Sequence, residues 1–402
     1  MLSTAEARRA IFAAMPRLEA EAVSLDGSTG RVLRQCVATE RDQPPFDRVT
    51  MDGIAVRFAD IELGRREFSI KGTQHAGDPV TKLDDGAGCI EVMTGTTMPI
   101  DADTVIAVER IRVADGIAIL EEGYRPDPGQ FVHRQGSDHT AGTRVLEDGC
   151  VITPMDVAII ASCGIDTVSV ARLPNIRVIS TGNELVSPAG PIEPHQIRLS
   201  NGPALVSMLV SQGFVNTKHD HIPDDPQELE QRIGRHLEAA DTLVLSGGVS
   251  MGKADFVPRV LADLGVKVEF HRISQRPGKP MWFGIGPNGQ TVFALPGNPV
   301  STLVCCRQYV LPALFQACGR PERALQTVVL DTPVVFKPAL TYFLPARLAS
   351  SASGQTIATP NPTNTSGDFM ALTGTDGYLE LGASTTEFRE GTTLPFHAWA
   401  SP

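Results

Sequence analysis

Apolar strand patterns alternate with helical patterns through residues 174–318, and three of the strand patterns end in glycine. The runs IRVISTG, TLVLSGG and TVFALPG are short, continuous and apolar, and each precedes a helical pattern. This alternation is typical of a doubly wound parallel sheet with helices on both faces. Ligands of such sheets bind beyond the carboxyl ends of the strands. We therefore expect a ligand site at the strand ends that carry Gly182, Gly247, Gly248 and Gly297.

The rest of the chain carries other patterns. Short alternating runs broken by Gly and Pro lie before residue 140 and indicate a β-rich unit. Thr153 and Pro154 then carry the signals that begin a helix, and the end of this helix resembles a hinge. Residues 325–402 return to short β patterns, which predict a small β-barrel or sandwich. A length of 402 residues allows two to four domains of roughly 150 residues each.

Charge and composition argue against several classes of protein. Asp and Glu number 46 against 35 Lys and Arg, which gives a formal net charge of -11. This balance argues against a general affinity for nucleic acid or for anionic membranes. No apolar run approaches the roughly 20 residues that cross a bilayer, and the N-terminus has no signal-peptide core. The seven cysteines are scattered without a CxxC pair, which indicates buried reduced thiols and a cytoplasmic protein.

The segment LSGGVSMGKAD, residues 245–255, follows an apolar strand pattern and is a candidate phosphate loop. Glycine allows positive φ and close approach of the backbone, so that successive N–H groups can face a phosphate. The spacing also fits a P-loop, but Ala254 stands where a P-loop carries the Ser or Thr that holds Mg²⁺. Pro258 follows closely, where a P-loop would have its helix established. We interpret the segment as a phosphate cradle of another type, with a plain tight turn as the alternative.

Acidic side chains follow three strand or loop patterns of the same unit. Glu184 lies in STGNEL, Asp224 in HIPDD and Asp255 in GKAD. Carboxylate oxygens are the ligands that Mg²⁺ prefers, so the three acids predict a divalent cation site. The alternatives are a solvated Glu184 and a capping role for Asp224 or Asp225, and the pattern does not decide which of these two would bind the ion.

Two further segments can bind anions. QRPGKP places the cations of Arg276 and Lys279 on a stiff turn that could hold a tetrahedral oxyanion, although a solvated surface turn is the alternative. ALPGNPVS lies at a strand-to-helix junction, where free N–H groups and the helix dipole favour anions. Earlier in the same unit, the segment SNGPALVSMLVSQG of residues 200–213 is helical, and Ser200 or Asn201 would cap it.

Seven segments together resemble the molybdopterin molybdenumtransferase family of the MoeA type, which includes the E domain of gephyrin. They come in the family's order over residues 40–305, and the C-terminal region is similar more loosely, through PARL and TNTSGDFMAL. The segments are PPFDRVTMDGIAV, MTGTTMPIDADTVI, GSDHTAGTRV, ISTGNEL, LSGGVSMGKADFV, RPGKP and ALPGNPVS.

The resemblance implies an elongated homodimer with four domains in each subunit. The third domain has the doubly wound, MogA-like fold that is shared with molybdopterin adenylyltransferases, and the fourth is a β-barrel. The active site would be a cleft between the third and fourth domains of one subunit and the second domain of the other. The expected boundaries are a discontinuous linking domain I of residues 1–40 and 141–172, a β-rich domain II of residues 41–140, a molybdopterin-binding domain III of residues 173–322, and domain IV of residues 323–402.

The resemblance also implies the reaction. Molybdenum from molybdate is inserted into adenylated molybdopterin with Mg²⁺, which releases AMP and forms molybdenum cofactor. A molybdopterin adenylyltransferase and apo-molybdoenzymes would be further partners, and neither nucleic acid nor a membrane is expected to be one. The alternatives are a molybdopterin adenylyltransferase and a non-catalytic carrier or scaffold.

The residues that match the family's functional positions fall into four groups. The catalytic candidates are Glu184, Asp255, Asp52, Thr94 and Asp138, of which the last three would approach the partner's cleft. The metal candidates are Glu184, Asp224 and Asp255. The candidates for substrate binding are Thr181, Gly182, Ser246, Gly247, Gly248, Ser250, Gly252, Pro296, Gly297 and Asn298. The molybdate candidates are Arg276, Lys279, Ser301 and Ser366.

Two positions depart from the family's pattern. Leu199 stands where members often carry Asp, and Leu340 stands where many carry Arg. Arg347 is a candidate to compensate for the second change. The departures bear on the fourth domain's share of molybdate binding and not on the class of reaction.

Overall fold

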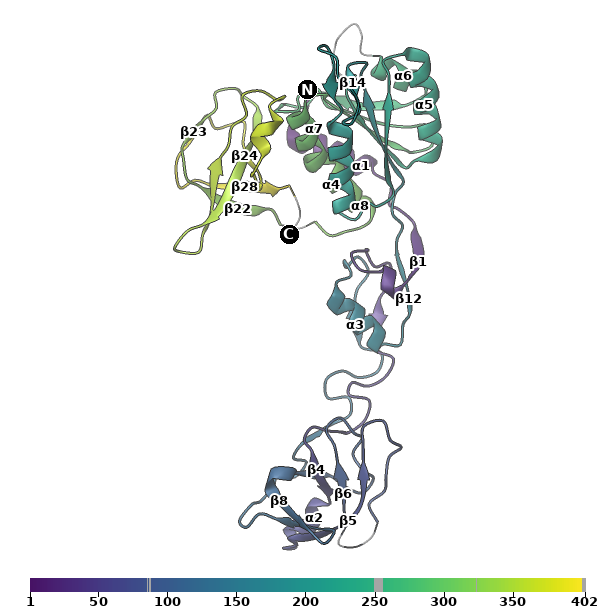
Figure 1. Cartoon of the computed structure of the whole chain (residues 1–402), viewed down its shortest axis with the longest axis vertical. Coiled ribbons are helices and arrows are strands. Elements are labelled where there is room, and N and C mark those ends of the chain that lie inside the picture. Colours follow the sequence, from purple (N-terminus) through teal and green to yellow (C-terminus); the bar gives the residue numbers. More distant parts are fainter. Residues whose placement is uncertain (85, 87, 249–255, 323, 400–402) are drawn as a thin grey trace.

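The computed structural model describes residues 1–84, 86, 88–248, 256–322 and 324–399. The molecule is elongated: an α/β unit and a β-barrel lie side by side at one end, and a β-rich unit lies at the other (Figure 1). A slender linking unit joins the two ends. In the part of the chain that is described, no helix has the length and apolar character that a membrane span requires.

The α/β unit is built on a six-stranded sheet, counted within the described residues, with the strand order β16-β13-β17-β21-β20-β18. Neighbours among the first four strands are parallel, which confirms the doubly wound fold. Strand β20 was not predicted. It runs antiparallel to both of its neighbours, and a short turn over residues 286–290 joins it to β21 as a hairpin. The strands are β13 (Ile176–Thr181), β16 (Thr217–Ile222), β17 (Thr242–Ser246), β18 (Lys267–His271), β20 (Trp282–Ile285) and β21 (Thr291–Leu295).

Helices cover both faces of this sheet because successive side chains of a strand point to opposite faces. Val178 packs in one hydrophobic core with helices α4, α7 and α8, whereas its neighbour Ile179 packs in the other with α5 and α6. Helix α1 also belongs to the first core, through Ala7 and Ile11. The helices are α1 (Thr4–Ala14), α4 (Asn201–Ser211), α5 (Pro226–Ala239), α6 (Val257–Asp263), α7 (Pro299–Cys305) and α8 (Leu311–Ala317), with a π-helix (Cys306–Val310) between the last two.

The C-terminal unit is a closed barrel. The sequence had predicted either a small β-barrel or a sandwich, and the structure shows the barrel. Among the described residues, five strands each pair with two neighbours, and the contact between β24 and β26 closes the ring. Strand β19 (Gln275–Arg276) leaves the α/β unit and pairs with β24, so the RPGKP turn adjoins the barrel. The barrel strands are β22 (Gln326–Leu330), β24 (Thr341–Ser350), β25 (Thr356–Pro360), β26 (Gly377–Leu381) and β28 (Thr393–Ala398), with a minor pair of β23 (Val334–Val335) and β27 (Glu387–Phe388) and a 3-10 helix (Phe369–Leu372).

The β-rich unit at the far end contains a mixed sheet with the order β7-β4-β6-β5-β9-β8. Helix α2 (Phe58–Glu62) follows β4. The strands are β4 (Gly53–Val56), β5 (Glu67–Gln74), β6 (Gly88–Val92), β7 (Thr104–Ala107), β8 (Ile111–Ala114) and β9 (Ile117–Leu120).

The chain passes through the linking unit twice, once toward the β-rich unit and once on the way back (Figure 1). Thr153 caps α3 through its side chain, and Pro154 occupies the first turn of that helix, as expected. The elements are β1 (Ala20–Ser24) paired with β12 (Thr167–Ala171), β2 (Val37–Ala38) paired with β11 (Arg144–Leu146), and α3 (Pro154–Ser162). The next pair, β3 (Arg48–Val49) with β10 (Val132–His133), belongs to the β-rich unit, because Val49 and Val132 pack in its core.

A charged clamp holds the linking unit against the α/β unit. The guanidinium of Arg172, just after β12, donates two hydrogen bonds of 2.8 Å to the two carboxylate oxygens of Asp241. The backbone N–H of Asn175 donates a third, of 2.7 Å. Burial raises the pKa of Asp241, but the hydrogen bonds from Arg172 and Asn175 outweigh it, so that the pKa lies below its usual value.

Replacing this carboxylate by an amide, in Asp241→Asn, is expected to lower the free energy of unfolding by about 1–3 kcal/mol at pH 7. Because the pKa of Asp241 is lower in the folded chain than in the unfolded chain, the carboxylate stabilises the fold at every pH above the unfolded pKa of roughly 3.9. This contribution to stability is lost only as the pH falls below that value. Urea unfolding should therefore give the same difference at pH 7 and pH 5. Asp148→Asn, which removes an exposed ion pair with Arg17, is the control with little effect. A difference that disappears by pH 5 would contradict the clamp.

Candidate functional site

A cavity of about 550 Å³ lies where the sheet of the α/β unit meets the start of helices α4 and α7. It opens at the carboxyl ends of β13 and β17, which is the position that the strand-end glycines predicted. A loop of the barrel forms part of its wall through Gly367 and Phe369. Of the residues expected to bind substrate or metal, the lining includes Thr181, Glu184, Ser246, Gly247, Gly297 and Asn298.

Close backbone packing explains the glycines in this wall. Gly247 has a φ of +103°, and a Cβ atom there would lie 2.7 Å from the carbonyl oxygen of Thr181. A Cβ on Gly297 would lie 3.6 Å from the Cα of Gly247, so the two glycine loops adjoin each other. The hydroxyl oxygen of Thr181 is buried against Gly247 and Gly248 and has no hydrogen-bond partner among the described residues. Ser250, Gly252 and Asp255, the other expected members of this loop, lie outside the described residues.

Asn201 joins two parts of the same wall, although its sequence context predicted only a capping role. Its side-chain amide donates to the Ser246 hydroxyl at 2.9 Å and to the Gly297 carbonyl oxygen at 2.7 Å. It therefore joins the ends of β17 and β21. Helix α4 begins after Ser200, whose side chain makes no capping hydrogen bond.

Of the acidic candidates for a metal that the structure describes, Glu184 lines the cavity and Asp224 lies on an adjoining loop. Glu184 is exposed, and its carboxylate folds over Gly182, where a Cβ atom would lie 2.7 Å from Oε2. The backbone N–H of Asp224 donates to the Asn183 side chain at 3.0 Å, so the two acidic loops are in contact. Asp225 caps α5, because its Oδ1 accepts from the N–H groups of residues 227 and 228. Within the described residues no group of three His, Cys, Asp or Glu side chains is arranged to hold a metal ion.

None of the expected oxyanion residues is in the lining of the cavity. Arg276 and Lys279 are both exposed on the RPGKP turn. The Arg276 guanidinium lies 5.9 Å from the ring centre of Tyr342 in the barrel. Ser301 is only 3% exposed, and its carbonyl oxygen lies 3.7 Å from the Cβ position of Gly278 in the same turn.

Ser366 docks the barrel onto the start of α7. Its hydroxyl accepts a hydrogen bond of 2.6 Å from the Asn298 side chain, and its carbonyl oxygen accepts one of 3.1 Å from the Val300 N–H. The second contact satisfies one of the N–H groups that a helix start leaves free. Pro296, before this junction, accepts through its carbonyl oxygen from the hydroxyl of Thr302.

The departures from the family's pattern lie in different surroundings. Leu199 lines the cavity and is largely buried, so this part of the wall is apolar. Leu340 precedes β24 and is half-buried. The Arg347 guanidinium donates to the carbonyl oxygen of Thr373 at 3.5 Å, away from the cavity lining.

The remaining candidates lie on the β-rich unit, at the opposite end of the molecule from the cavity (Figure 1). Asp52 accepts from the Thr94 hydroxyl at 2.7 Å and from the Thr94 N–H at 2.6 Å, and these hydrogen bonds hold the pKa of Asp52 below its usual value. Asp138 lies 3.0 Å from Nε2 of His133, whose Nδ1 lies 3.1 Å from the Arg48 guanidinium. His133 was not among the residues predicted from the sequence, although it stands five residues before Asp138.

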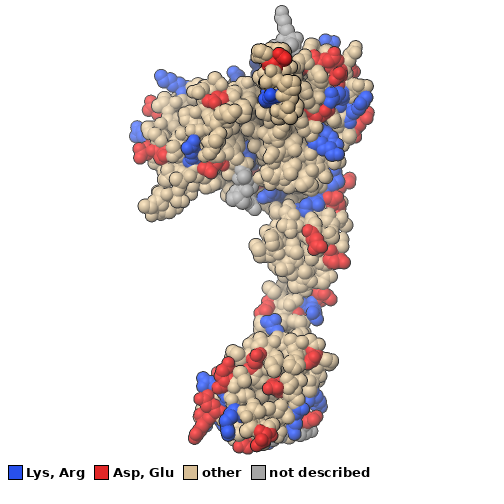
Figure 2. Space-filling view, viewed as in Figure 1, with Lys and Arg blue, Asp and Glu red and all other residues tan. Residues whose placement is uncertain are grey.

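Charge on the surface is mixed. Figure 2 shows Lys and Arg side chains interspersed with Asp and Glu over the visible face. The cavity is lined by polar side chains of several kinds, among them the hydroxyls of Thr181 and Ser246, the amide of Asn298 and the carboxylate of Glu184.

Comparisons with known proteins agree over the whole chain. Three family models match: the MoeA N-terminal region (domain I and II) over residues 2–164, a probable molybdopterin binding domain over residues 177–316, and the MoeA C-terminal region (domain IV) over residues 327–399. The chain is 40% identical over 404 residues to a molybdopterin molybdenumtransferase of Synechocystis sp., covering 99% of this chain and 100% of the relative. A molybdopterin molybdenumtransferase of Nostoc sp. is 32% identical over 79% of this chain and 75% of its own length.

Solved structures agree with the sequence relatives. A molybdopterin biosynthesis MoeA protein from Pyrococcus horikosii is 28% identical, with a TM-score of 0.85 over 100% of both chains. The sequence and the fold are therefore similar to those of one family along the full length. The chain belongs to the MoeA family of molybdopterin molybdenumtransferases and is an enzyme of the transferase class.

Proposed function

We propose that this chain inserts molybdenum from molybdate into adenylated molybdopterin, releasing AMP and forming molybdenum cofactor. The observation that carries the proposal is the strand-end cavity of about 550 Å³, with Gly247 and Gly297 in contact across its wall. It lies in a chain 40% identical over its length to a molybdopterin molybdenumtransferase.

The phosphate end of the substrate would lie against the loops of Gly247 and Gly297. Both loops lie in the cavity wall, and the start of α7 adds the positive end of a helix dipole. Asn201 holds the two loops together, and Asn298 lines the wall beside them.

Gly247→Ala is expected to weaken binding of adenylated molybdopterin by about tenfold, since the new methyl group would move the loop away from Thr181. Calorimetric titration of the substrate measures the change. Gly354→Ala is the matched control, because Gly354 also has a positive φ, of +82°, but has no atom within 4 Å of its Cβ position. Unchanged affinity in Gly247→Ala would remove this loop from the site.

The acids at the rim fit a hard divalent cation. Glu184 is exposed at the cavity, Asp224 lies on the adjoining loop, and Asp225 is engaged as a helix cap. Magnesium held by Glu184 and Asp224, together with Asp255, would neutralise charge on the phosphoanhydride of the substrate.

Molybdate, the second substrate, would be held at the RPGKP turn. Arg276 and Lys279 are exposed cations there, Ser301 packs against the turn, and Ser366 docks the barrel nearby. A molybdate oxygen would then attack the adenylyl phosphorus, which breaks the phosphoanhydride bond and releases the phosphate of the pterin. Transfer of molybdenum from this adenylyl molybdate to the dithiolene sulfurs would break the molybdenum–oxygen bond to the adenylyl group and so release AMP. Positioning and charge stabilisation would supply the rate, and no side-chain nucleophile is required.

A second copy of the chain would complete the site. Asp52, Thr94 and Asp138 lie far from the cavity of their own chain, so in a homodimer the β-rich unit of one subunit would approach the cavity of the other (Figure 1). The substrate would come from a molybdopterin adenylyltransferase, and apo-molybdoenzymes would receive the product.

The test mixes the protein with adenylated molybdopterin and Mg²⁺ and follows AMP release with and without molybdate. Molybdate-dependent release with formation of the cofactor is the expected result. Tight pterin binding without turnover would indicate a carrier instead. Consumption of ATP without molybdate would indicate an adenylyltransferase.

A further inference from the structure

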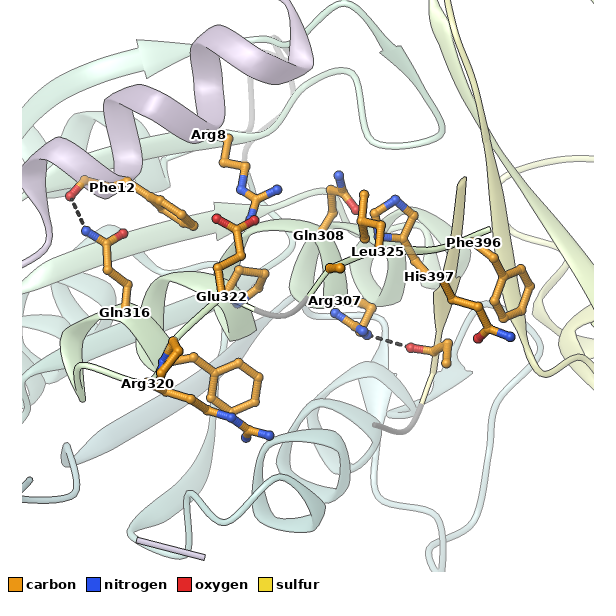
Figure 3. A pocket seen from close by; sticks show the side chains of 16 residues that line it. Arg8, Phe12, Arg307, Gln308, Gln316, Arg320, Glu322, Leu325, Phe396 and His397 are labelled. Carbon is orange, nitrogen blue, oxygen red and sulfur yellow. Dashed lines mark hydrogen bonds and ion pairs between the residues drawn. The ribbon is translucent and has the colours of Figure 1, made fainter. Parts of the chain in front are cut away.

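A second cavity, of about 390 Å³, lies where helix α1, the helix that runs through α7 and α8, and barrel strand β28 meet (Figure 3). It shares no lining residue with the candidate functional site among the residues described. Its volume is within the range of roughly 300–1,000 Å³ that small-molecule sites have.

Three half-buried arginines face this cavity in a chain whose formal net charge is -11: Arg8, Arg307 and Arg320. Arg8 forms an ion pair with Glu322 across the opening (Figure 3). Arg307 donates from Nε to the carbonyl oxygen of Ala398 at 2.6 Å. Its two terminal nitrogens have no partner among the residues that the structure describes. A half-buried guanidinium with free donors favours a carboxylate or a phosphate, which it can bind through two parallel hydrogen bonds.

The wall beside the arginines is apolar and partly aromatic. The guanidinium of Arg320 lies 4.4 Å from the centre of the Phe315 ring, and that of Arg8 lies 4.9 Å from the centre of the Phe12 ring. Pro312 and Leu325 extend this surface, and the side chain of Leu325 is 46% exposed. Such a wall packs against the flat face of a ligand, and the guanidinium groups add cation–π attraction for an aromatic one.

The helix that supplies Arg307 is locally widened. Residues 306–310 form a π-helix, in which the N–H of Leu311 donates to the carbonyl oxygen of Cys306, five residues before it. Insertions of this kind are rare and are found frequently at functional sites. Here the π-helix contains both Arg307 and Gln308, which line the cavity, and Gln308 accepts a hydrogen bond from buried Tyr378 of the barrel at 3.0 Å.

We propose that this cavity binds a flat organic anion, an aromatic carboxylate or phosphate, with the anionic group on Arg307 and the ring against Phe315 and Leu325. The site is separate from the molybdopterin cavity, and no part of the proposal depends on the function proposed above.

The test uses the fluorescent dye anilinonaphthalene sulfonate, which is flat and anionic, and the uncharged dye phenylnaphthylamine, which has the same ring frame. Arg307→Gln is expected to bind the sulfonate about tenfold more weakly and the uncharged dye unchanged. Arg259→Gln is the matched control, since Arg259 is exposed on α6 and forms an ion pair only with Asp263 among the described residues. It should bind both dyes as the unaltered chain does.

A second variant keeps the proposal testable if the loss of Arg307 impairs folding, which thermal unfolding by circular dichroism would reveal. Ala324→Trp fills the cavity from an exposed position and should abolish binding of the sulfonate. Phenyl phosphate and benzoate should displace the dye whereas benzyl alcohol should not, and the better competitor identifies the anionic group. Equal sulfonate affinity in Ala324→Trp and the unaltered chain, or displacement by benzyl alcohol, would overturn the proposal.

Discussion

Glu184→Ala should lower molybdate-dependent AMP release by well over ~10-fold, since a lost metal contact typically costs more than ~1.4 kcal/mol in the transition state. The carboxylate of Glu184 stands at the rim of the cavity, folded over Gly182, beside the loop of Asp224. Alanine removes both oxygens and leaves the backbone in place. Single-turnover AMP release at saturating substrate measures the effect.

Two companion variants separate charge from packing. Glu184→Gln keeps the shape of the side chain and removes its charge, so it should be nearly as slow as alanine if the carboxylate binds a cation. Glu193→Ala removes an exposed glutamate from the loop between β14 (Leu185–Val186) and β15 (Ile197–Arg198), and it should leave the rate unchanged. Near-normal release in Glu184→Ala would reject the metal assignment.

The position of the cavity could be predicted from the sequence because its signals are local. A short apolar run that ends in glycine indicates a strand and the close backbone approach that follows it. Gly247 bears this out, since its φ of +103° and its contact with Thr181 both favour glycine. Since parallel strands end at one edge of a sheet, local patterns far apart in the chain indicate one site.

Contacts between distant segments could not be predicted in the same way. Asn201 has the sequence context of a helix cap, but its amide bonds to Ser246 and Gly297, which are 45 and 96 residues away. Strand β20 has only a short apolar pattern, and this pattern directly follows the Gly and Pro residues of the RPGKP turn, so it was not recognised as a strand. The π-helix at 306–310 lies within an ordinary apolar helical pattern, which gives no sign of the wider turn.

The resemblance, and not any local pattern, singled out Asp52, Thr94 and Asp138. Asp52 and Thr94 do contact each other, through two hydrogen bonds across 42 residues of sequence. The structure also separates them from the cavity by the length of the linking unit (Figure 1). If the Asp52–Thr94 pair and the cavity act in one reaction, they must therefore come from two copies of the chain.

Mixed dimers of Asp52→Asn and Glu184→Ala should recover activity that neither variant has alone. Asparagine keeps an oxygen that can accept both hydrogen bonds from Thr94 and removes only the charge. In a heterodimer, the intact cavity of the Asp52→Asn subunit faces the intact β-rich unit of the other subunit. Each mixed dimer has one intact site of its two, so the isolated mixed dimer should have about half of the activity of the unaltered chain. A randomly paired mixture, half of which is mixed dimer, should have about a quarter.

Co-expression of the two variants with different affinity tags, followed by sequential purification on both, isolates the mixed dimer for the AMP-release assay. The negative control is the mixed dimer of Glu184→Ala and Gly247→Ala, assayed at a substrate concentration well below the dissociation constant, where the weaker binding of Gly247→Ala lowers the rate. Both of its substitutions lie in the cavity wall, so each site would carry one of them and the activity would stay low. If the dimer of Asp52→Asn and Glu184→Ala is as inactive as the separate variants, the two groups do not act in a shared site. If Asp52→Asn alone is fully active, the charge of Asp52 has no part in the reaction, and the β-rich unit would instead contribute through the shape of its surface.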